Sequence, residues 1–123
     1  MTRRVLVVDD DPLLREVAKV ALEMVGGWQV LTAGSGAEAQ LVAAEQQPDA
    51  LLLDVMMPGQ DGPTTVLALQ RDPRTREIPV VFLTAKAGAA TAGDSTGTAV
   101  AGVIAKPFDP MTLSVEVARL LGW

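Results

Sequence analysis

Six polar residues in this sequence directly follow, or end, short apolar runs. They are Asp9, Asp10, Asp11, Asp54, Thr84 and Lys106. Carboxylates brought close together repel one another and resist ionising together unless a divalent cation or a buried ammonium group compensates. Magnesium takes about six oxygen ligands and keeps several of them as water or phosphate oxygens. The pattern therefore predicts an oxygen-ligand cation site that faces one fixed positive charge.

Two of these carboxylates are the best placed to bind a cation. Asp10 and Asp54 can each supply one oxygen, and the backbone carbonyl of Met56 is our candidate for a third ligand. Lys106 supplies the positive charge opposite. Each residue type also has an ordinary explanation, since an aspartate after a strand often caps a helix, as we expect for Asp11. Only the combination, in this order, points to chemistry.

The elements that must position these residues follow from the apolar pattern. We expect strands at Val5–Val8, Trp28–Ala33, Ala50–Leu53, Pro79–Thr84 and Val103–Ala105. We expect a helix from Pro12 to Val25, stopped by Gly26-Gly27, and a second from Gly36 to Gln46 behind a Ser35/Glu38 capping box. A third should open at Pro63 and be closed by Asp72-Pro73, and the last should run from an Asp109-Pro110 cap to Leu121. Such alternation predicts an α/β fold with a parallel sheet between helices. The carboxyl ends of its strands meet at one edge, where functional groups gather.

The stretch from Ala85 to Gly102 departs from this pattern. Fourteen of its eighteen residues are Ala, Gly or Thr. A crossover between two parallel strands calls for a fifth helix here. Glycine costs about 1 kcal/mol against alanine inside a helix, so we expect this helix to be short or frayed.

Composition excludes several classes of function. The chain has no cysteine and no histidine, which removes disulfides, thiolate or imidazole metal ligands and Ser-His-Asp catalysis. The formal net charge of −5 argues against a nucleic-acid surface. No apolar run approaches the ~20 residues of a membrane span, and no signal peptide is evident. We expect a cytoplasmic protein made of one domain, residues 1–123, without an output domain.

At this point the sequence resembles the receiver domains of two-component response regulators. The matching segments are Val7–Asp10, Leu53–Gly62, Leu83–Ala85 and Lys106–Phe108. The resemblance covers the whole chain and includes the spacing between the segments. It implies a flavodoxin-like, doubly wound five-stranded sheet of order 2-1-3-4-5 with five helices.

The resemblance also implies a role for each site residue. Asp54 would be the phosphoacceptor, and Mg2+ would be bound by Asp10 directly and by Asp9 mainly through water. Thr84 would bind a phosphoryl oxygen, and Lys106 would pair first with Asp54 and then with the phosphoryl group. The Lys106–Pro107 peptide would be cis.

The partners implied are a histidine kinase or a histidine phosphotransfer protein as donor, and an unidentified protein target. The chain would be a phosphorelay switch or phosphate sink, a monomer or a weak phosphorylation-dependent dimer. Its only catalysis would be self-phosphorylation and slow autodephosphorylation.

Two features depart from the family pattern. Receiver domains usually carry Tyr or Phe three residues before the lysine, where this chain has Val103. Together with the Gly-rich stretch, this suggests that switching changes the order of residues 85–102 more than it turns a ring. The positions two residues beyond Asp54 and Thr84 are Met56 and Lys86, and neither is an obvious base for water. We therefore expect slow loss of the phosphoryl group.

Two other functions remain open from the sequence. The Asp9–Asp11 run also resembles the start of haloacid-dehalogenase-type phosphatases, which need a later acidic pair. This chain offers only Asp109 and Glu116 after Lys106. A pure interaction module that keeps the fold without being phosphorylated is the second alternative.

Overall fold

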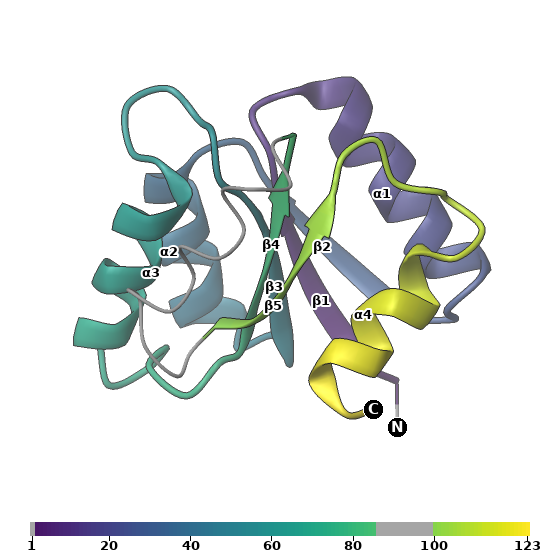
Figure 1. Cartoon of the computed structure of the whole chain (residues 1–123). Coiled ribbons are helices and arrows are strands. Elements are labelled where there is room, and N and C mark those ends of the chain that lie inside the picture. The colour runs from purple at the N-terminus through teal and green to yellow at the C-terminus, as the bar shows by residue number, and fades with distance from the viewer. Residues whose placement is uncertain (1, 86–99) are drawn as a thin grey trace.

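The computed structural model describes residues 2–85 and 100–123, and these form a parallel α/β sandwich (Figure 1). The five strands are β1 (Arg4–Val8), β2 (Gln29–Ala33), β3 (Ala50–Asp54), β4 (Val80–Thr84) and β5 (Val100–Ala105). The helices of the described residues are α1 (Pro12–Met24), α2 (Gly36–Gln46), α3 (Gly62–Arg71) and α4 (Leu113–Leu121). The strand order is β2-β1-β3-β4-β5, with parallel pairing throughout, as predicted.

Helices cover both faces of the sheet, and each face has its own apolar core. On one face α1 and α4 bury residues such as Val7, Leu52 and Leu113. On the other, α2 and α3 bury residues such as Leu53 and Phe82. The central strands therefore carry apolar side chains at successive positions instead of alternating with polar ones. This double burial fixes the height at which each strand ends, and thus the place of the polar residues that follow.

The helix starts depend on the caps that the sequence contains. The Asp11 carboxylate accepts hydrogen bonds from the backbone N–H groups of Leu13 and Leu14, and Pro12 occupies the first turn of α1. The Ser35 hydroxyl accepts from the N–H of Glu38 at 3.1 Å. The Asp11 and Ser35 caps are thus confirmed, and both satisfy donors that a helix start leaves unpaired.

Strand β5 is longer than predicted. It begins at Val100, so residues 100–102 belong to the sheet and not to the connecting stretch. Its pairing with β4 is irregular, because Val80 and Val81 are opposite Val100 and Gly102, which leaves one extra residue in β5. A side chain at Gly102 would collide with Leu120 of α4, its Cβ lying 2.5 Å from Cδ2. The predicted fifth helix otherwise falls outside the described residues.

The predicted cap of the last helix was wrong. Helix α4 begins at Leu113, after Thr112, whose side chain makes no capping hydrogen bond. Asp109 instead closes the preceding turn, where its carboxylate accepts from the N–H of Met111 at 2.9 Å. Pro110 thus belongs to this turn, three residues before the first residue of the helix.

The C-terminal Trp123 contacts residues that precede β1 and β2, at the end of the sheet opposite the polar residues. The rings of Trp28 and Trp123 meet edge to face at 5.1 Å between centroids. The Arg3 guanidinium carbon lies 4.5 Å from the centre of the Trp123 ring, in cation–π geometry. Among the described residues, no helix has the length and apolar character that crossing a bilayer requires.

Candidate functional site

Three carboxylates meet at the carboxyl edge of the sheet. Val8 is opposite Leu53 in the β1–β3 pairing, so the next residues, Asp9 and Asp54, leave adjacent strands at the same height. Both are almost fully buried, with 1% and 3% of their surface exposed, whereas Asp10 is exposed. Each of the three offers an oxygen, and these oxygens lie within 4.8 Å of one another.

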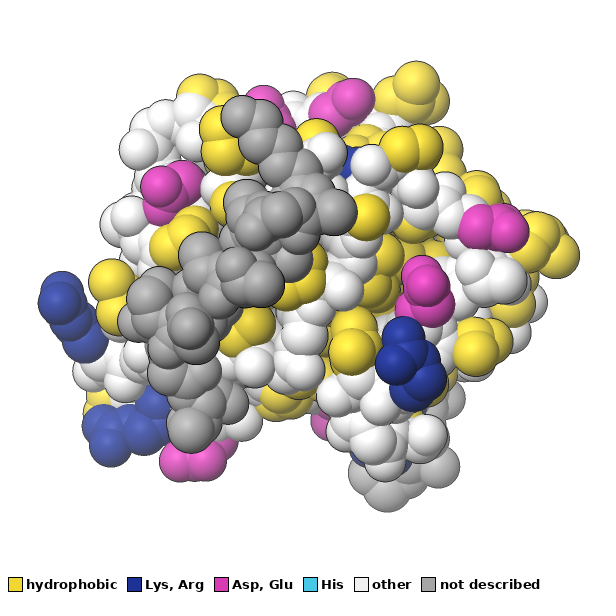
Figure 2. All heavy atoms as spheres, viewed as in Figure 1, with side chains coloured by type: hydrophobic (Ala, Val, Ile, Leu, Met, Phe, Trp, Pro, Cys, Tyr) yellow, Lys and Arg dark blue, Asp and Glu magenta, His cyan; other side chains and the backbone are white. Residues whose placement is uncertain are grey.

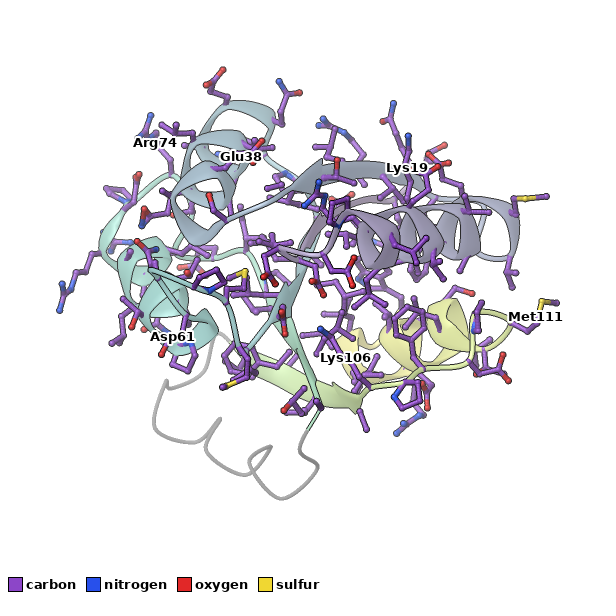
Figure 3. The ribbon with its side chains drawn as sticks, turned by 90° about the horizontal axis from the view of Figure 1, so that it is seen from above. Lys19, Glu38, Asp61, Arg74, Lys106 and Met111 are labelled. Carbon is purple, nitrogen blue, oxygen red and sulfur yellow. The ribbon has the colours of Figure 1, made fainter. Side chains whose placement is uncertain are left out.

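Lys106 joins two of these carboxylates from the opposite side. Its Nζ lies 2.8 Å from Asp9 Oδ2 and 3.1 Å from Asp54 Oδ1. The side chain starts just beyond β5, where the Lys106 N–H donates to the carbonyl of Thr84 at 2.7 Å, and in Figure 3 it points inward from the loop. The Lys106–Pro107 peptide is cis, as the resemblance implied. The lysine thus neutralises part of the charge that the aspartates concentrate.

Burial and charge shift the pKa of both partners. Burial raises the pKa of Asp54, and the negative charge of Asp9 adds to this, while the hydrogen bond from Lys106 only partly offsets them. For Lys106 burial acts to lower the pKa, but hydrogen bonds to Asp9 and Asp54 outweigh it, so the net shift is upward. The Lys106 ammonium group therefore stays charged beside Asp54, and its attraction opposes the effect of burial on the Asp54 pKa.

Asp9 is fixed by contacts at every polar atom of its backbone and side chain. Its N–H donates to the carbonyl of Ala33 at 3.2 Å, and its Oδ1 accepts from the N–H of Asp11 at 2.9 Å. Its backbone carbonyl accepts from Nη1 of Arg15 at 2.8 Å. Sequence reasoning missed Arg15, although its place four residues after Asp11 puts it on the first turns of α1, next to the acidic run.

The loop after β3 wraps tightly against the site. The N–H of Met56 donates to Asp54 Oδ1 at 3.3 Å, and the N–H of Gly62 returns to the carbonyl of Val55 at 2.9 Å. A Cβ at Gly62 would lie 2.8 Å from the Asp54 carbonyl oxygen, so only glycine allows this approach. Asp61 then caps α3 by accepting from the N–H of Thr64 at 2.9 Å. Met56 itself is 65% exposed.

Thr84 ends the strand next to Asp54, and Val103 lies in β5, three residues before Lys106; neither belongs to the acidic cluster. Thr84 ends β4, is 1% exposed, and is opposite Ala105 of β5. Val103 is opposite Phe82 and packs against the core that α2 and α3 cover. The position where receiver domains usually carry an aromatic ring is thus aliphatic here, with the ring of Phe82 on the neighbouring strand.

The donor set fits magnesium. Carboxylate oxygens are the hard ligands that Mg2+ prefers, and the three aspartates converge closely enough to share one ion. Asp10 faces solvent, which leaves room for the water molecules that this ion retains. Among the described residues, no other group of three acidic side chains converges in this way. Asp109 and Glu116 lie before and within α4 and take no part.

The family model described as "Response regulator receiver domain" matches residues 5–118, which include every residue of this site. The chain belongs to the receiver domain family of two-component response regulators. A receiver domain is generally a signalling switch and not an enzyme, and receiver domains bind Mg2+ at their aspartate pocket. The predicted family is confirmed, and the phosphatase alternative is not supported.

Known proteins agree with this assignment. The chemotaxis response regulator CheY4 of Vibrio cholerae has the same fold, with a TM-score of 0.88 at 30% identity over 98% of this chain and 99% of that one. The receiver domain of sensor histidine kinase PA1611 from Pseudomonas aeruginosa gives a TM-score of 0.83 at 26% identity, with complete coverage of both chains. That structure holds a magnesium ion in its active site cleft.

Curated relatives are longer than this chain. The DNA-binding dual master transcriptional regulator RpaA of Synechocystis is 36% identical over 118 residues, which are 96% of this chain and 48% of that protein. This chain spans about half of its length, so the activity of the whole relative does not transfer.

On the face in Figure 2, Lys and Arg side chains lie in separate places and form no continuous basic surface among the described residues.

Proposed function

We propose that this chain is a phosphoacceptor switch that receives a phosphoryl group on Asp54 from a phosphohistidine donor in the presence of Mg2+. The donor is a histidine kinase or a histidine phosphotransfer protein. The observation that carries the proposal is the pairing of one partly buried lysine with two buried carboxylates: Lys106 contacts both Asp9 and Asp54. An aspartate with a purely structural role would be neutralised by one partner of its own and would not have to share a lysine with a second aspartate.

The chemistry follows from what each residue can do. A carboxylate oxygen of Asp54 attacks the phosphorus of the donor, and a P–O bond forms as the P–N bond breaks. The bonding electrons leave with the imidazole, which takes up a proton from solvent. Phosphoryl transfer needs positioning and charge neutralisation more than it needs a base. Lys106 supplies part of that neutralisation, since its Nζ already lies 3.1 Å from the acceptor.

Magnesium fits the remaining part of the site. Asp9, Asp10 and Asp54 would hold the ion, with the backbone carbonyl of Met56 as a further ligand, and Asp9 also holds Lys106 in place. When bound, Mg2+ neutralises charge on the carboxylates and on the phosphoryl oxygens. The magnesium in the PA1611 receiver domain supports this assignment.

The signal would arise at the edge of the site. The acyl phosphate adds charge and acceptor oxygens beside Thr84, whose hydroxyl would donate to one of them. Lys106 would move from the Asp54 carboxylate to the phosphoryl group. The packing around Val103 and Phe82 would then shift between two populated arrangements, which a protein partner reads by contact.

Labelling with acetyl phosphate tests this proposal. We expect wild-type protein to gain the mass of one phosphoryl group in Mg2+ and none in EDTA. Asp54→Asn should gain nothing. Asp61→Asn is the matched control, because Asp61 is a loop aspartate that caps α3 outside the cluster, and it should label normally. A wild-type protein that stays unlabelled under these conditions would favour an interaction module that is never phosphorylated.

A further inference from the structure

Arg15 reaches from α1 across the loop that carries the acidic residues. Its Nη1 donates to the backbone carbonyl of Asp9 at 2.8 Å, in a partly buried position. The guanidinium also lies against the β2–α2 connection, since a Cβ built on Gly34 would be 3.0 Å from Nη1. In the described parts of the chain, Arg15 forms no ion pair with a carboxylate. Its one specific contact is therefore with a main-chain oxygen.

That oxygen belongs to the peptide group that joins Asp9 to Asp10. A peptide group is planar, so fixing its carbonyl oxygen also fixes the direction in which the next residue leaves. Asp9 itself is already held, because its N–H donates to the Ala33 carbonyl and its carboxylate contacts Lys106. Asp10 is exposed, and none of the described residues supports its side chain in a comparable way. Arg15 thus holds the end of the peptide group that sets where Asp10 points.

We propose that Arg15 is a positioning residue for Mg2+: through the Asp9 carbonyl it orients the Asp10 carboxylate toward the oxygens of Asp9 and Asp54. This inference rests on the proposed function of the site. The planar, multiply donating guanidinium suits the task better than an ammonium group, which has no fixed donor direction. Residues that orient the ligands of a metal typically change its affinity 10- to 100-fold when they are replaced.

Calorimetric titration with Mg2+ tests the proposal without any phosphoryl chemistry. Arg15→Met removes the donor and keeps most of the apolar stem, and it should weaken Mg2+ binding at least about tenfold. Arg15→Lys keeps the charge without the planar donors, and it should still lose about threefold or more. Lys19→Met is the matched control, because Lys19 lies one turn further along α1 and points away from the site (Figure 3), so binding should change less than about twofold.

A second measurement separates positioning from general damage to the fold. The rate of labelling by acetyl phosphate should fall in Arg15→Met at limiting Mg2+ and return to the wild-type rate at saturating Mg2+. A rate that stays low at saturation means that Arg15 supports the fold and not the ion, and this overturns the proposal. If Arg15→Met does not fold, the same comparison with Arg15→Lys decides.

The outcomes also distinguish this inference from the function on which it rests. Equal Mg2+ affinity in the wild type and in Arg15→Met overturns the inference alone. Full affinity in Arg15→Lys together with a loss in Arg15→Met assigns the effect to charge, and this contradicts positioning through the carbonyl. A wild-type protein that takes up no Mg2+ contradicts the proposed function itself, and the role of Arg15 with it.

Discussion

Replacing Lys106 by methionine should destabilise the metal-free protein by about 3 kcal/mol at pH 7. With an effective dielectric constant of about 20, Coulomb's law gives attractions of about 6 and about 5 kcal/mol for its contacts at 2.8 and 3.1 Å. Desolvation of the ammonium group offsets part of this, and removing one partner of a buried pair typically costs about 3–5 kcal/mol. The lysine side chain is 18% exposed, which favours the lower end of that range.

The loss should depend on pH in a defined direction. Without Lys106 the pKa of Asp54, already raised by burial, should rise further, because the hydrogen bond that lowered it is gone. A group whose pKa is raised in the folded state destabilises it only when ionised, so the deficit is full above that pKa and shrinks as the pH falls through it. Added Mg2+ should also reduce the deficit, since a ligand that binds only the folded state stabilises it.

Urea denaturation in EDTA, followed by tryptophan fluorescence, measures this effect. The edge-to-face pair of Trp28 and Trp123 is built from distant parts of the chain and separates on unfolding. Lys19→Met makes the same substitution on the outer side of α1 and should change stability by less than about 0.5 kcal/mol. A Lys106→Met variant within about 0.5 kcal/mol of wild type at pH 7, or a deficit that does not shrink on acidification, would refute this reasoning.

Three further predictions follow from single contacts. Asp61→Ala should lower the free energy of unfolding by about 1 kcal/mol at neutral pH. The hydrogen bond from the backbone N–H of Thr64 lowers the pKa of Asp61, so this stabilisation is present above the pKa of the unfolded state and is lost as the pH falls through the pKa of the folded state. Urea denaturation of both proteins at pH 7 and pH 3 would show the difference. Gly62→Ala should lower the free energy of unfolding by about 1–3 kcal/mol and weaken Mg2+ binding in calorimetry, because the added Cβ pushes on the Asp54 carbonyl. An unchanged Mg2+ affinity would show that this loop does not affect ion binding. Loss of the phosphoryl group should be slow, because Met56 supplies no base for water, and Met56→Glu should accelerate it in a radioactive decay assay; rapid loss from wild type at neutral pH with Mg2+ would contradict this.

Much of the site could be predicted because strand ends are visible in the sequence. Buried parallel strands appear as unbroken apolar runs, and the residues after them must meet at one edge of the sheet. Asp9, Asp54 and Lys106 are therefore predictable as a cluster, and the structure brings them together. Arg15 was not predictable in this way, because its contact is to a backbone oxygen and nothing in residue type distinguishes it from a surface arginine.

The misses in the fold have local physical causes. Gly102 indicates a loop by its type, yet it lies in an edge strand because Leu120 packs where its side chain would be. Asp109 resembles a helix cap, but its carboxylate is already used by the turn before α4. In both cases a tertiary contact or a neighbouring turn outweighs the local preference of the residue. The predictions for Lys86 and for the connecting helix lie outside the described residues.

The most direct test of the account is to locate the phosphoryl group. Borohydride reduces an aspartyl phosphate to homoserine, which marks the modified residue in a peptide map. After incubation with acetyl phosphate and Mg2+, we predict homoserine at position 54 alone, with the mark absent in EDTA and in Asp54→Asn. A mark at Asp9 or Asp10 instead, or a mark that persists in Asp54→Asn, would contradict the claim that Asp54 is the phosphoacceptor.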